Sequence, residues 1–181
     1  MNLYKAKVLS YAEYRTAAIY HASVSALETI DKVQRSFLAD IGVDETSALL
    51  DFNLAPLGLR GDIAMLGLTH RTVLGQGPAH FQKFFFTENC EHRRSKRHRR
   101  HHRQLHEYRK DKYLDAVGRS ALGLTSVYNL LTNEVTEAND VKTFQCLLQD
   151  MAKDCASRGT TDWQHLLSTR HRLHEHPLQK Y

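Results

Sequence analysis

The chain has 181 residues and a formal net charge of +5 at pH 7, from 25 lysines and arginines against 20 acidic residues. Its hydrophobic fraction of 41% and charged fraction of 25% are close to globular averages, which excludes a wholly disordered chain. The cysteines, Cys90, Cys146 and Cys155, are odd in number, which excludes a disulfide framework and favours a reducing compartment, nuclear or cytoplasmic. No stretch approaches the roughly 20 apolar residues of a membrane span, and charges interrupt the N-terminal residues as no signal peptide would allow.

Apolar residues recur at spacings of three and four along most of the chain, which is typical of amphipathic helices. The spacing predicts helices over residues 3–21, 27–41, 44–50, 56–74, 114–131 and 141–158, and a last turn over residues 163–167. Local capping signals support the helix starts and ends. These signals are Ser25 with Glu28, Asp44, Asn139 or Asp140, and Asp162 at the starts, and Gly42 and Gly159 at the ends.

The predicted fold is therefore all-α, with roughly seven helices in two groups separated by a basic, histidine-rich segment. The expected parts are an N-terminal group (1–87), the basic segment (88–112), a C-terminal group (113–167) and a flexible, frayed tail (168–181). Three glycines weaken the helix over residues 56–74 by about 1 kcal/mol each relative to alanine. Close helix packing and relaxed sequence constraint both remain open as explanations for Gly58, Gly61 and Gly67.

The positive charge is concentrated in the basic segment, residues 88–112, which holds ten lysines or arginines and four acids, a net of +6. The rest of the chain has a net charge of −1. Arginine predominates, which suits bidentate phosphate contacts, and phosphate neutralisation gives salt-sensitive, sequence-independent affinity. The segment therefore predicts RNA or DNA binding through Arg93, Arg94, Lys96, Arg97, Arg99, Arg100, Arg103 and Arg109. A nuclear-localisation signal uses the same residues, and a solvated linker is the alternative to both.

An aromatic cluster precedes the basic segment and suggests a different class of function. The cluster consists of Phe81, Phe84, Phe85 and Phe86. If these rings form an exposed patch, the chain is better described as a helical protein-interaction module whose basic segment is a targeting signal or a linker.

Five of the twelve histidines lie in the basic segment and raise the question of a zinc site. The candidate ligands are Cys90, His92, His98, His101, His102 and His106. Structural zinc sites commonly use two closely spaced thiolates, whereas only Cys90 is nearby and the surrounding positive charge opposes a dication. We therefore predict no metal and no cofactor. His70, on the apolar face of its helix, is expected to be a hydrogen-bonded core residue.

No catalytic motif is present in the sequence. It lacks G-x-S-x-G, a phosphate-binding glycine-rich loop, H-E-x-x-H and the paired aspartates of polymerases. Four aspartates stand alone on helical patterns, where surface roles are expected: Asp51, Asp62, Asp150 and Asp154. We predict that the chain is not an enzyme.

Several sequence lines resemble the region after the palm of non-LTR (LINE-like) retrotransposon reverse transcriptases. They begin with LYKAKVLSYAEYRT (3–16), DKVQRSFLADIG (31–42), FNLAPL (52–57) and RGDIAMLGLTHRTVLG (60–75). They continue with HHRQLHEYR (101–109), SALGLTSVYNLL (120–131) and VKTFQCLLQ (141–149), so the resemblance spans most of the chain. The sequence departs from the family at Gly61, where a second basic residue is expected, and at Thr132, where proline is common.

The resemblance implies a helical thumb and post-thumb region, the part that guides the nucleic-acid duplex. The family's fingers, catalytic palm and endonuclease would lie upstream of this chain. We therefore expect a fragment of a retroelement without the catalytic aspartates, for which an upstream polymerase domain is a candidate partner.

Overall fold

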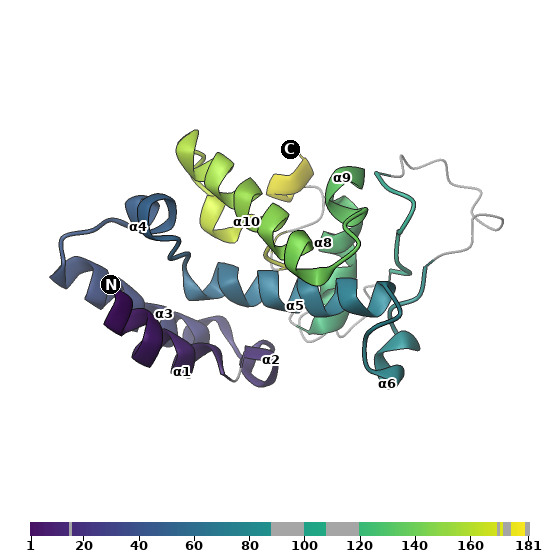
Figure 1. The fold of residues 1–181 in the computed structure, drawn as a ribbon, viewed down its shortest axis with the longest axis horizontal. Helices are drawn as coiled ribbons and strands as arrows, with labels where there is room; N and C mark the ends of the chain where they lie inside the picture. The colour runs from purple at the N-terminus through teal and green to yellow at the C-terminus, as the bar shows by residue number, and fades with distance from the viewer. Residues whose placement is uncertain (15, 88–99, 108–119, 170, 172–174, 180–181) are drawn as a thin grey trace.

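A computed structural model describes residues 1–14, 16–87, 100–107, 120–169, 171 and 175–179. The all-α prediction is confirmed for these residues, which form helices and short helical turns (Figure 1). Their β-type pairing is limited to one isolated antiparallel bridge between Thr87 and Leu105. None of the described helices is both long enough and apolar enough to cross a lipid bilayer.

The elements before the basic segment are η1 (Tyr4–Leu9, a π-helix), α1 (Ser10–Glu13), α2 (Thr16–Ile19), α3 (Val24–Asp40), α4 (Glu45–Phe52), α5 (Leu57–Val73) and α6 (Ala79–Gln82). Those after it are η2 (Ala121–Gly123), α8 (Leu124–Leu130), α9 (Asn133–Thr136), α10 (Val141–Ser157), η3 (Trp163–His165) and η5 (Pro177–Gln179).

Local capping sets several of the helix boundaries. The Asp44 carboxylate accepts the N–H groups of Thr46 and Ser47 at 2.9 and 3.0 Å and starts α4. The Asp140 carboxylate accepts the N–H of Thr143 at 2.8 Å and starts α10 in the same way. Both caps confirm the prediction, because a side-chain oxygen satisfies N–H groups that the first helical turn leaves unpaired.

Two predicted caps are wrong. Helix α3 begins after Ser23, whose hydroxyl accepts the N–H of Ala26 at 3.4 Å, so Ser25 lies inside the helix. Asp162 makes no side-chain cap at the start of η3. The glycines predicted to end helices are confirmed, since Gly42 and Gly159 adopt φ values of 68° and 70°, which glycine reaches without a steric cost.

Helix α5 runs through the middle of the molecule, with α10 packed across it (Figure 1). Leu66 of α5, Tyr128 of α8, and Phe144 and Leu148 of α10 are fully buried in one core, which therefore joins residues from before and after the basic segment. A methyl group at Gly67 would overlap the side-chain amide of Gln145 on α10. The two helices pack closely at position 67, where alanine would require the flexible Gln145 side chain to move.

A smaller apolar cluster holds the N-terminal helices together. Tyr4 of η1 stacks on Phe37 of α3 with 4.1 Å between ring centroids, and Leu38 of α3 and Ala48 of α4 are buried beside them. At the other end of the chain, within the stretch expected to be a flexible tail, Leu178 is buried against the main core.

The position of Phe144 at the α5–α10 crossing makes it a test of this architecture. Truncation of Phe144 to alanine should lower the free energy of unfolding by about 3–5 kcal/mol, since it removes a large buried ring and leaves a cavity. Urea denaturation followed by circular dichroism measures the change. Phe84→Ala, at a half-exposed ring, is the matched control and should cost less than about 1 kcal/mol. Equal losses in the two variants would contradict the assigned core.

Candidate functional site

Two of the eight predicted nucleic-acid-binding residues, Arg100 and Arg103, belong to the described part of the chain. The other six, Arg93, Arg94, Lys96, Arg97, Arg99 and Arg109, lie outside it. Arg100 and Arg103 open the segment 100–107, which lies against α8 and α9 through the hydrogen bonds described below.

The guanidinium of Arg100 binds main-chain carbonyls from two distant parts of the chain. Its Nη1 donates to the carbonyl oxygens of Leu130 at 2.9 Å and Leu178 at 2.7 Å. Its Nη2 donates to the carbonyl and the side-chain oxygen of Gln179 at 3.3 and 3.2 Å. Leu130 is the last residue of α8, so Arg100 satisfies a helix-terminal carbonyl and ties η5 to that helix.

Arg103 makes the same kind of contact one helix further on. Its Nη1 donates to the carbonyls of Thr136 at 2.7 Å and Ala138 at 3.2 Å. Thr136 is the last residue of α9, and a cation near a helix C-terminus is favoured by the helix dipole. Arg100 and Arg103 therefore have structural roles, and the predicted phosphate contacts rest on the other six residues.

The expectation that His70 is a hydrogen-bonded core residue is confirmed. Its ring stacks on Phe144 with 4.0 Å between centroids, and its Nε2 lies 2.9 Å from the carbonyl oxygen of Ala138. A carbonyl only accepts, so Nε2 carries the proton and Nδ1 accepts from the Tyr128 hydroxyl at 2.9 Å. Burial lowers the pKa of His70, in keeping with this neutral form. With both nitrogens hydrogen-bonded, this ring is not arranged to bind a metal.

His101, within the basic segment, is also buried, with 4% of its surface exposed. Its Nε2–H donates to the carbonyl of Tyr128 at 3.0 Å, and the ring lies edge-on to that tyrosine. Burial lowers the pKa of His101 to about 4, so the imidazole is neutral at pH 7. His101 is therefore a packing residue and adds no charge for nucleic-acid binding.

The residues around Leu105 attach the basic segment to the helical body through hydrogen bonds. The buried Leu105 exchanges both main-chain hydrogen bonds with the side-chain amide of Asn129, at 2.8 and 2.9 Å. The N–H of His106 donates to the carbonyl of Phe86 at 3.1 Å, beside the bridge of Thr87 and Leu105. The chain positions that flank residues 88–104 are thus held side by side on the helical body.

The zinc candidates are not brought together in the described ranges. Cys90, His92 and His98 lie outside them. His102 donates to the side-chain oxygen of Asn133 at 3.2 Å, and His106 stacks on Phe86 at 5.1 Å between centroids. Among the residues that the structure describes, no group of three His, Cys, Asp or Glu side chains is placed to hold a metal ion.

The phenylalanine cluster is divided between the core and the surface. Phe85 is buried and Phe81 packs partly against the core, whereas Phe84 and Phe86 are each 46% exposed. The four rings do not form one exposed patch, and this part of the argument for a protein-interaction module is weakened.

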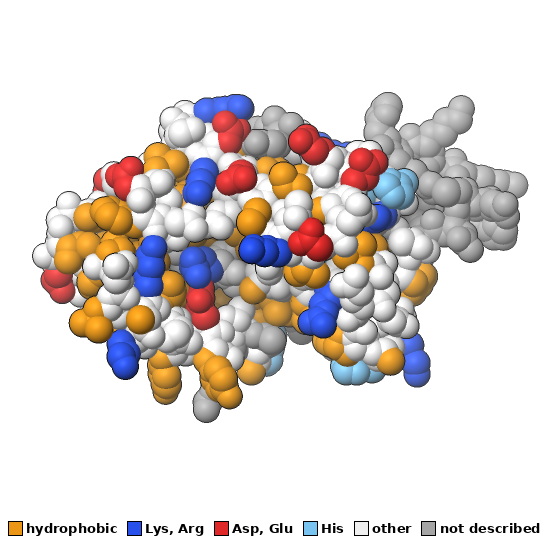
Figure 2. All heavy atoms as spheres, in the orientation of Figure 1, with side chains coloured by type: hydrophobic (Ala, Val, Ile, Leu, Met, Phe, Trp, Pro, Cys, Tyr) orange, Lys and Arg blue, Asp and Glu red, His pale blue; other side chains and the backbone are white. Residues whose placement is uncertain are grey.

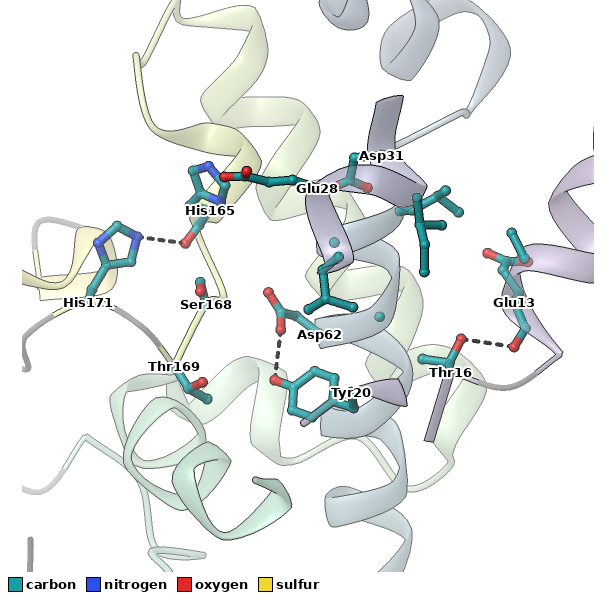
Figure 3. Close-up of a pocket in the computed structure, with 16 residues that line it drawn as sticks. Glu13, Thr16, Tyr20, Glu28, Asp31, Asp62, His165, Ser168, Thr169 and His171 are labelled. Carbon is teal, nitrogen blue, oxygen red and sulfur yellow. Dashed lines mark hydrogen bonds between the residues drawn. The ribbon is translucent and has the colours of Figure 1, made fainter. Parts of the chain in front are cut away.

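A cavity of about 390 Å³ lies between the N-terminal helices, α3, α5 and the chain after η3 (Figure 3). Its lining comes from four separate stretches of sequence, which is why sequence patterns alone did not reveal it. The lining residues are Ala12, Glu13, Thr16, Tyr20, Leu27, Glu28, Ile30, Asp31, Leu57, Gly58, Gly61, Asp62, His165, Ser168, Thr169 and His171. The glycines that weaken α5 are the sequence feature that could have indicated this cavity.

Comparisons of this chain with protein-family models, curated proteins and solved structures found no match.

A structural role for Arg100 predicts that its loss destabilises the fold. Arg100→Ala should lower the free energy of unfolding by about 1.5–3 kcal/mol, because partly buried carbonyls lose a charged donor. Arg100→Lys keeps the charge but lacks the guanidinium fork and should restore only part of the loss. Thermal unfolding measures both. Arg158→Ala, at an exposed pair with Asp154, is the control and should change stability by less than about 1 kcal/mol.

The lowered pKa of His101 predicts a dependence of stability on acid. Between pH 6.5 and about 4 the unfolded chain binds a proton at this imidazole that the folded chain does not. Stability should therefore fall as the pH drops through this range, by up to about 3 kcal/mol from this residue. Urea titrations at several pH values test this. His101→Gln, which keeps a donor for the Tyr128 carbonyl, should flatten the dependence, whereas the exposed His80→Gln should not; an unchanged slope in His101→Gln would refute the assignment.

Proposed function

We propose that this chain is a non-catalytic helical module that binds the phosphate backbone of RNA or DNA through its basic segment. The binding residues are Arg93, Arg94, Lys96, Arg97, Arg99 and Arg109, the cations of the proposed site other than Arg100 and Arg103. The observation that carries the proposal is the concentration of a +6 net charge in residues 88–112 of an otherwise near-neutral chain.

The arrangement of charge on the body supports this assignment. Basic and acidic side chains are interspersed over the described part of the face in Figure 2. A mixed surface of this kind gives little net attraction for a polyanion. The paired positions Thr87 and Leu105 lie side by side on the helical body. The net positive charge of the chain is therefore that of the basic segment.

We further propose that the module is a remnant of a non-LTR retrotransposon reverse transcriptase, which would account for nucleic-acid binding without catalysis. This origin rests on the ordered sequence lines from residue 3 to residue 149. A primer-extension assay tests the absence of catalysis: the isolated chain should add no nucleotides, and measurable extension would overturn the proposal.

Backbone binding predicts a steep dependence on salt. Fluorescence anisotropy with a mixed-sequence duplex DNA and a single-stranded RNA, measured from 50 to 300 mM salt, gives the slope of log affinity against log salt. If all six cations engage phosphates of the duplex, the slope should approach about −5. Replacement of Arg93, Arg94, Arg97 and Arg99 by glutamine should reduce its magnitude by about three to four, equally for different sequences.

The matched control replaces four exposed cations of the helical body by glutamine instead: Lys32, Arg35, Lys142 and Arg158. This variant has the same net charge as the quadruple glutamine variant and should retain most of the slope. Equal effects of the two variants, or binding that ignores salt, would contradict the proposal. Circular dichroism confirms that both variants remain helical.

A helical protein-interaction module is the second candidate function, and an exposed helix face favours it. Leu3, Tyr11 and Tyr14 are 75%, 85% and 84% exposed, and their spacing brings them to one side of η1 and α1. Hydrophobic side chains gather over the N-terminal helices in Figure 2. If the unmodified chain binds neither RNA nor DNA at 50 mM salt, this candidate becomes the better one.

A further inference from the structure

The cavity beside α5 has the size and lining of a small-molecule site. Its volume of about 390 Å³ lies within the range of ligand pockets, which are mostly apolar with a few polar groups. Leu27 and Ile30 of α3 and Leu57 of α5 supply apolar surface, and polar side chains from these and other elements surround it (Figure 3).

Two glycines keep the α5 side of the cavity open. A methyl group at Gly58 would lie 3.7 Å from the Asp31 carboxylate, and one at Gly61 would lie 3.6 Å from the Thr16 methyl, both ordinary contact distances. Unlike Gly67, these positions would accept alanine without overlap. Each glycine weakens a helix by about 1 kcal/mol relative to alanine. Because alanine would fit at both positions, close packing does not explain why glycine is present. Their effect in the structure is to leave room in the cavity.

The charged groups of the lining are mainly carboxylates. Glu13 pairs with Arg60, and Asp62 accepts a hydrogen bond from the Tyr20 hydroxyl at 2.7 Å. Asp31 is half-buried, and desolvation raises its pKa although the Gly58 backbone hydrogen bond and the charges of Arg35 and His165 act in the opposite direction. A cation beside Asp31 would offset this desolvation.

We propose that this cavity binds a small organic cation, a protonated primary amine on a compact apolar body. The ammonium group contacts the Asp31 carboxylate, and the apolar part lies over Gly58 and Gly61. An anionic ligand would face the carboxylates of Glu28, Asp31 and Asp62, and a neutral one would add no charge to offset the desolvation of Asp31. This site is independent of the basic segment, which attracts ligands of the opposite charge.

Benzylamine and benzyl alcohol are suitable probes, because they share a ring and differ in the cationic group. Titration of each into the full chain at pH 7, followed by ¹H–¹⁵N NMR, should shift the amide signals of Asp31, Gly58 and Gly61 with benzylamine. Benzyl alcohol should bind at least about tenfold more weakly, the effect of losing one partly buried charge contact. Equal affinities, or shifts located elsewhere, would overturn the proposal.

Two variants separate binding from folding. Asp31→Asn should weaken benzylamine binding about tenfold, whereas Asp40→Asn, at an exposed acid on the same helix, should not change it. Gly61→Ala should preserve or raise the melting temperature, because it improves the helix, while its methyl group occupies the site and weakens binding severalfold. Unchanged binding in Asp31→Asn and Gly61→Ala, with both variants folded, would refute the site.

Discussion

The fold depends on a buried carbonyl, that of Ala138, which accepts hydrogen bonds from His70 on α5 and from Arg103 of the basic segment. His70 in turn accepts from the Tyr128 hydroxyl of α8 and stacks on Phe144 of α10. Five parts of the chain therefore meet around one polar cluster in an apolar core. Such a cluster fixes a single arrangement, because any other packing would leave one of these groups buried without a partner.

The two kinds of arginine in this protein illustrate how environment divides one residue type between roles. Arg100 and Arg103 bind carbonyls at helix ends, where the partial negative charge of the helix dipole is already present in the folded chain. The remaining arginines of the segment have been assigned to an external polyanion in our proposal. The same guanidinium chemistry thus serves internal and external negative charge, and the count of cations overstates the number available for binding.

Local signals in the sequence predicted much of the fold. Asp44, Asp140, Gly42 and Gly159 act through neighbours a few residues away, so their roles were readable from the sequence. Ser23 and Ser25 were not separable, because each hydroxyl could accept an N–H of the first turn. The destinations of Arg100 and Arg103 could not be predicted, since their carbonyl partners lie 30 or more residues away. The cavity beside α5 depends on four distant stretches and was invisible for the same reason.

The contacts of Arg100 also have a consequence for the order of folding. One guanidinium bonds to Leu130 and Leu178, which are 30 and 78 positions away along the chain. Contacts of such large sequence separation require long loops to close and form after local helices and nearby pairs. Packing of η5 onto α8 is then a late event in folding. By the same reasoning we expect the contact between η5 and α8 to open first in the native state, before the α5–α10 crossing is disturbed.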